Sequence, residues 1–196
     1  MTHARRAAVH SAAALALLAG CATAPSKFYA LSSTATLDAA PPAPYAVLVG
    51  PVSIPASVDR PEFVVEVAPN RVELDEFNRW ASPLQNNISR VVAENLVTML
   101  GTQRVAQFQQ SLNLDADFRV AIEVQSFDSA LGESATLNAV WIVRRTKDGK
   151  SQTGRTSLRE PTSAAGFEGI AAAHSRALTK MSQEIADAVR SLERGS

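Results

Sequence analysis

The chain has 196 residues, with 19 basic and 19 acidic residues, three histidines and one cysteine. This length suffices for one hydrophobic core, since domains of about 100–150 residues are typical. The balanced charge argues against a nucleic-acid-binding protein, which needs a basic surface to neutralise phosphates. A single cysteine excludes a disulfide within the chain, so the fold must depend on its hydrophobic core.

The first 20 residues are predicted to be a lipoprotein signal peptide. Arg5-Arg6 forms a positive start, an apolar run covers residues 12–19, and residues 18–21 read Leu-Ala-Gly-Cys. Secretory signals have this order of charge, apolar stretch and small residues. The apolar run is far shorter than the roughly 20 residues of a membrane-spanning helix. We therefore expect cleavage after residue 20 and acylation, including palmitate, at the thiol of Cys21.

Acylation of Cys21 would hold the mature protein on a membrane. Burial contributes ~0.8 kcal/mol per CH₂ and one chain binds only reversibly, so the several chains of a bacterial lipoprotein make release negligible. Ala22, rather than aspartate, follows the cysteine, which favours the outer membrane under the usual sorting rule. Residues 21–27 then form a short lipidated tether, and residues 28–196 form a single domain.

Short apolar runs predict the strands of the N-terminal half. Residues 28–31 could form an edge strand, and residues 45–54 are rich in valine, as in a buried strand. Pro51 lacks a backbone donor, so the second half of this strand should lie at an edge or a bulge. Residues 63–67 and 72–74 predict two strands joined by a tight turn.

The first helix is predicted to start at Ser82 and to stop near Gly101. Ser82 can cap it, Pro83 suits the first helical position, and Gln85 would complete a capping box. Apolar residues follow at helical spacing: Leu84, Ile88, Val91, Val92 and Leu96. Gly101 is a typical helix stop.

The C-terminal half predicts three strands and a longer helix. Residues 118–124 and 137–143 alternate in polarity with the period of half-buried strands. Asp148-Gly149 supplies a hairpin turn, and the return strand should cover residues 151–159. A helix over residues 164–192 carries a long apolar stripe. Both helical stripes most simply pack on the sheet, although part of one could contact a partner.

No convincing catalytic, cofactor or metal-binding constellation is found in the sequence. His174 is the only histidine outside the signal peptide, and no cysteine or second histidine accompanies it. Its place beside the apolar stripe favours a packed helix histidine. Residues 149–151 resemble the end of a phosphate-binding loop but lack its first glycine. We therefore expect no enzyme, no cofactor and no metal, with a secreted hydrolase as a minor alternative.

Two charged groups have simple explanations. Glu73, Asp75 and Glu76 form an acidic cluster that fits a solvated loop or edge strand. Arg144 and Arg145 follow an apolar strand, and a solvated strand end explains them most simply. An anionic partner surface is the alternative for the arginine pair.

Several ordered motifs resemble a known family. They are Val49-Gly50-Pro51-Val52-Ser53-Ile54-Pro55, Val58-Asp59-Arg60-Pro61, Phe77-Asn78-Arg79-Trp80-Ala81-Ser82-Pro83-Leu84 and Ala93-Glu94-Asn95-Leu96, with Phe28-Tyr29-Ala30-Leu31 after the cysteine. These stretches resemble the ABC-type transport auxiliary lipoproteins, most closely the PqiC (YmbA-type) branch. For Arg79 and Trp80 we expect a role in local structure, with a partner surface as the alternative.

The resemblance implies both a fold and a function. The implied fold is α+β, an antiparallel sheet with two helices packed on one face, similar to the N-terminal domain of TolB. The implied function is non-catalytic. A periplasmic lipoprotein on the outer membrane would dock an MCE-domain protein of an intermembrane lipid-transport system and so support membrane integrity. Inner-membrane transport components would be further partners, and a homo-oligomer is one option by analogy. The competing hypothesis is an independent carrier that holds acyl chains between the sheet and the helices.

Overall fold

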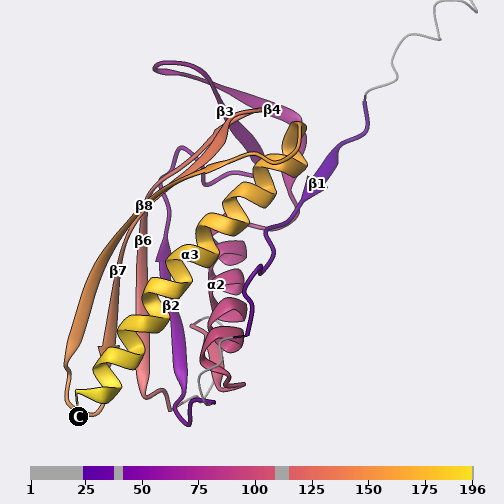
Figure 1. Ribbon diagram of the computed structural model, residues 1–196. Helices are drawn as coiled ribbons and strands as arrows, with labels where there is room; N and C mark the ends of the chain where they lie inside the picture. Colours follow the sequence, from indigo (N-terminus) through magenta and orange to yellow (C-terminus); the bar gives the residue numbers. More distant parts are fainter. Residues whose placement is uncertain (1–23, 38–41, 109–114, 196) are drawn as a thin grey trace, which may run out of the picture.

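One curled sheet of eight strands carries two helices on one of its faces (Figure 1). The computed structural model describes residues 24–37, 42–108 and 115–195. In chain order the elements are β1 (Lys27–Tyr29), β2 (Val47–Ser53), β3 (Glu62–Ala68), β4 (Arg71–Trp80), α2 (Leu84–Leu100), β5 (Val105–Gln107), β6 (Phe118–Ala130), β7 (Ser134–Arg145), β8 (Ser151–Pro161) and α3 (Gly166–Arg194).

β6 is the central strand, and its two edges have different neighbours. One edge pairs with β7 along its whole length. The other pairs first with β2 and then, at Ser129, with Val65 of β3. β5 extends the sheet beyond β2, β8 extends it beyond β7, and β4 and β1 extend it beyond β3.

The predicted α+β class with two packed helices is confirmed, and the sheet is mixed. The β3–β4, β6–β7 and β7–β8 pairs are antiparallel, as the resemblance implies. The β1–β4, β2–β5, β2–β6 and β3–β6 pairs are parallel. Parallel strands require long connections between them, and the chain supplies these, because α2 and other strands intervene.

The start of α2 differs from the prediction. Pro83 is the N-cap residue and no side chain caps the helix, so the predicted capping box at Ser82 is wrong. The chain stays extended as far as Trp80, whose N–H bonds to the Pro61 carbonyl. The Gln85 amide, instead of closing a capping box, donates to the carbonyl of Val52 on β2. The Gln85 side chain thus bonds the helix to the sheet instead of capping the helix N-terminus.

The irregularity predicted at Pro51 is confirmed, because the register of β2 against β6 shifts between Val49 and Val52. The end of α2 is also as predicted. Gly101 follows the helix with a left-handed φ of 64°.

A polar segment before β2 lies against both helices. The Ser32 N–H donates to Ser175 Oγ at 3.1 Å, and Ser33 Oγ donates to Asn95 Oδ1 at 2.6 Å. The fully buried Asn95 then donates through Nδ2 to Ser182 Oγ at 3.1 Å. The segment that follows β1 is therefore held to α2 and α3 by side-chain hydrogen bonds. These bonds also satisfy the buried side-chain amide of Asn95.

Candidate functional site

Aromatic side chains from five different elements meet beneath the β3–β4 hairpin. They are Tyr29, Phe63, Trp80, Phe127, Phe167 and His174. The ring centroids of Phe63 and Trp80 are 4.1 Å apart, and those of Phe127 and His174 are 3.7 Å apart in a parallel stack. Such contacts add to the stabilisation from burial. The cluster thus joins the hairpin to β1, to β6 and to the start of α3.

Trp80 is part of this cluster and is 95% buried, with 5% of its surface exposed. Its placement favours the local-structure interpretation for the indole. Arg79, the next residue back, pairs with Glu62 across the hairpin and is about one-third exposed. The partner-surface hypothesis for the two residues stays a prediction. Of the two, only Arg79 has a side chain that a partner could reach.

His174 lies in the core, as predicted from its position beside the apolar stripe. Its Nε2 is 3.0 Å from Ser129 Oγ, and burial lowers its pKa to about 3. A hydroxyl beside an imidazole is the geometry of a nucleophile and its base. Here, however, both residues are buried and His174 Nδ1 has no hydrogen-bond partner among the described residues. An open pocket borders Ser129 but not His174, and no described carboxylate is hydrogen-bonded to the imidazole, so the geometry suits packing of the histidine.

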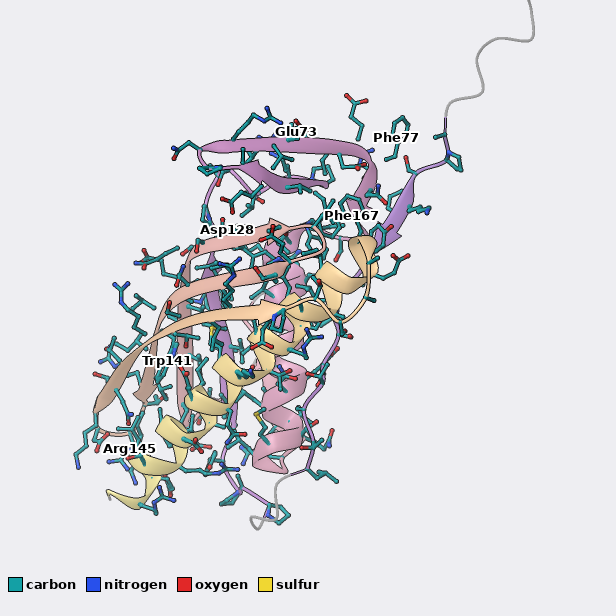
Figure 2. All side chains as sticks on the ribbon, turned by 45° about the horizontal axis from the view of Figure 1, so that its top comes forward. Glu73, Phe77, Asp128, Trp141, Arg145 and Phe167 are labelled. Carbon is teal, nitrogen blue, oxygen red and sulfur yellow. The ribbon has the colours of Figure 1, made fainter. Side chains whose placement is uncertain are left out.

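The acidic cluster lies on the exposed part of β4, as the sequence indicated. Glu73 is labelled on the hairpin in Figure 2 and pairs with Arg71 at 3.2 Å. Asp75 Oδ1 accepts hydrogen bonds from the backbone N–H groups of Phe77 and Asn78. Within the described ranges no three His, Cys, Asp or Glu side chains are arranged to hold a metal ion.

Arg145 differs from the prediction of a solvated strand end, because only 2% of its surface is exposed. Its guanidinium donates to both carboxylate oxygens of Asp148, at 3.0 and 2.6 Å, and to the carbonyl of Leu192. The hydrogen bond from Arg145 is the main reason that the pKa of Asp148 falls to about 2. Arg144, the other member of the pair, is exposed.

An open cleft of about 460 Å³ lies at this end of the molecule, opposite the aromatic cluster. Charged side chains of both signs contribute to its lining: Arg104, Asp115, Asp117, Arg145, Lys147 and Glu193. Pro44, Tyr45 and Ala116 also line it, so its walls mix charged and apolar groups, whereas a pocket for an acyl chain would be lined mainly by apolar ones. The cleft fits a polar contact better than a lipid-binding cavity.

The predicted lipid-attachment residue, Cys21, lies outside the described residues. None of the helices in the described part of the chain combines the length and apolarity needed to cross a membrane. The described chain begins at Ala24, and residues 24–28 are exposed before Tyr29 enters the core.

The fold defines a small α+β domain with a curled mixed sheet and two helices on one face. Residues 29–186 match the family model of the ABC-type transport auxiliary lipoprotein component. The match covers most of the chain, and the chain therefore belongs to this family.

Solved structures with the same fold include two of low sequence identity. The DUF330 protein XCC0632 from Xanthomonas campestris is 21% identical with a TM-score of 0.70, covering 87% of this chain and 99% of its own. A second, uncharacterised protein is 18% identical with a TM-score of 0.69, covering 85% and 99%. No curated protein matches the chain significantly.

Proposed function

We propose that this protein is a non-catalytic, outer-membrane-anchored periplasmic lipoprotein that docks an MCE-type intermembrane lipid-transport system. The family match carries the proposal, because it spans the folded domain from the end of β1 into the last third of α3. The complete burial of His174, which would be the base of a Ser129–His174 pair, supports a binding role over a catalytic one. Lipid attachment at Cys21 and sorting by Ala22 would place the domain on the periplasmic face of the outer membrane.

The independent lipid carrier is less well supported by the packing. It needs space for acyl chains between the sheet and the helices. That layer is instead filled by side chains with no exposed surface, among them Ile88, Leu96, Leu137, Leu178 and Ile185. Protein interiors packed in this way have few voids larger than a water molecule.

The test is photo-crosslinking in cells with the full, lipidated chain. A photoreactive amino acid is placed at exposed positions on three surfaces: Leu74 on the hairpin, Ile142 on the outer sheet face and Lys150 at the β7–β8 turn. We expect at least one position to capture an MCE-domain protein, identified by mass spectrometry. If correctly localised protein captures no transport component from any surface, the docking proposal is wrong.

A further inference from the structure

Exposed apolar side chains are concentrated at the end of the domain where the tether enters. Nine large hydrophobic residues among those described are strongly exposed, and five of them lie on β1, β3 and β4: Phe28, Val67, Val72, Leu74 and Phe77. Phe28 is 64% exposed and Phe77 is 39% exposed. Burying these exposed parts of the rings would be favourable.

Phe28, Phe77 and Arg79 lie close together where β1 pairs with the end of β4. Phe28 lies directly beside Arg79 in the parallel register. Asn78 and Tyr29 are joined by a hydrogen bond of 2.7 Å. Phe77 lies two residues before Arg79, in a stretch of β4 where the register against β3 shifts. We name this group the aromatic corner.

Two of the acidic groups near the aromatic corner are engaged within the domain, and Glu76, beside Phe77, is exposed. Glu62 pairs with Arg79 across the hairpin. Asp75 accepts three hydrogen bonds from Phe77 and Asn78. The corner thus presents two partly exposed aromatic rings near the ion-paired Arg79, and aromatic rings at a protein surface suit the headgroup layer of a bilayer.

The length of the tether limits where the corner can lie. Six residue steps separate Cys21 from Lys27, the first residue of β1. At 3.3–3.6 Å per residue they span at most about 22 Å. Figure 2 shows Phe77 at the end of the molecule where the tether leaves and Arg145 at the other end. An acylated cysteine would therefore keep Lys27, the residue before Phe28, within about 22 Å of the lipid headgroups.

We propose that the aromatic corner rests on the bilayer that holds the protein's own anchor, with the rings of Phe28 and Phe77 in the headgroup layer. This inference rests on the proposed anchoring at Cys21. The anchor and the corner then hold the domain at two points, which fixes its orientation and directs the β7–β8 turn away from the membrane.

The test uses the full lipidated chain in phosphatidylcholine vesicles, with and without brominated acyl chains that quench tryptophan fluorescence. Phe77→Trp reports on the corner, and Ile142→Trp is the matched control, since residue 142 is 38% exposed on the outer sheet face. The two native tryptophans are each 5% exposed and give a common background. We expect brominated lipid to reduce the emission added at position 77 and to leave that added at position 142 unchanged.

Flotation of the same samples tests the lipid anchor separately from the contact of the aromatic corner with the bilayer. If the protein floats with the vesicles but its emission at position 77 is equal in both lipids, the proposed contact of the aromatic corner with the bilayer is wrong and the proposed anchor is not contradicted. Protein that does not float overturns the anchor, and the inference with it.

Discussion

The indole of Trp141 on β7 occupies the space in which Gly154, its paired residue on β8, would carry a side chain. A Cβ at residue 154 would lie 2.1 Å from Cζ2 of the indole. The indole Nε1 also donates to Thr156 Oγ1 at 3.1 Å, which holds the ring across the strand. The aromatic ring thus covers a glycine that would otherwise weaken β8.

Replacing this glycine should therefore destabilise the protein. Gly154→Ala forces the indole to move in a packed core, and overpacking of this kind costs about 1–3 kcal/mol. Urea unfolding of the two proteins measures the difference. Gly195→Ala is the control, because its Cβ would meet only Ser191 O at 3.5 Å and Leu192 O at 3.9 Å, both ordinary contacts. Equal midpoints for wild type and Gly154→Ala would contradict the packing described.

His174 should make the stability depend on pH between 7 and 5. Its pKa is about 3 in the folded protein and about 6.5 in the unfolded chain. The unfolded chain therefore binds more protons in this window, so stability falls as the pH falls below 6.5. The expected loss between pH 7.5 and pH 5 is about 2 kcal/mol.

The matched variant for this measurement is His174→Gln, which cannot be protonated in this range. Denaturant unfolding at a series of pH values should show the decline in wild type and a flatter profile in the variant. A wild-type profile as flat as that of the variant would show that the histidine is not held neutral in the core.

Asp148 should contribute more to stability than an exposed acid in a similar ion pair. Asp148→Asn removes the charge that faces the guanidinium of Arg145, and an unpaired buried charge is strongly unfavourable. We expect a fall of several degrees in the thermal midpoint, measured by circular dichroism. Glu133→Gln is the control, because the Arg159–Glu133 pair is exposed on both sides.

The same pair predicts a loss of stability in acid. The pKa of Asp148 is about 2 in the folded protein, below its ordinary value. Its stabilising contribution is therefore present above about pH 4 and disappears as the pH falls towards 2. The stability of Asp148→Asn should decline less steeply over that range. If the variant and the wild type lose stability equally between about pH 4 and pH 2, the Arg145 contact is not maintained in solution.

Cys21→Ser should abolish both processing and acylation. Intact-mass measurement of the wild type should show a chain that begins at residue 21 and carries acyl chains, whereas the variant should keep residues 1–20. Ala22→Asp is the companion variant, since it keeps the lipid but should move the protein to the inner membrane on a density gradient. An unacylated wild-type protein would refute the predicted signal peptide.

Local patterns predicted most of the fold, and longer-range contacts account for what was missed. The alternation in β6 and β7 was readable because one face of each strand is buried against the helices. The full length of β4 was not readable, because the charged residues 71–79 form a strand only through pairing with β3 and β1. The Ser82 cap looked sound locally, yet β4 continues almost to the helix.

The candidate site was predicted only in part for the same reason. Ser129, the partner of His174, lies 45 residues away in the chain, and no local pattern joins them. Burial of Arg145 had one local signal, an aspartate three residues later across a hairpin turn. Its other contact, the carbonyl of Leu192, comes from the far end of α3.

The length of α3 sets a distance within the molecule. Near its first turn Phe167 contacts Tyr29 of β1, and in its last turn Leu192 contacts Arg145 beside the β7–β8 turn. Its 29 residues span about 44 Å at 1.5 Å per residue. α3 thus sets the spacing between the two ends of the domain, and a partner that binds at the β7–β8 turn is held about 4 nm from β1. Inserting one helical turn into α3 would change this distance by about 5 Å.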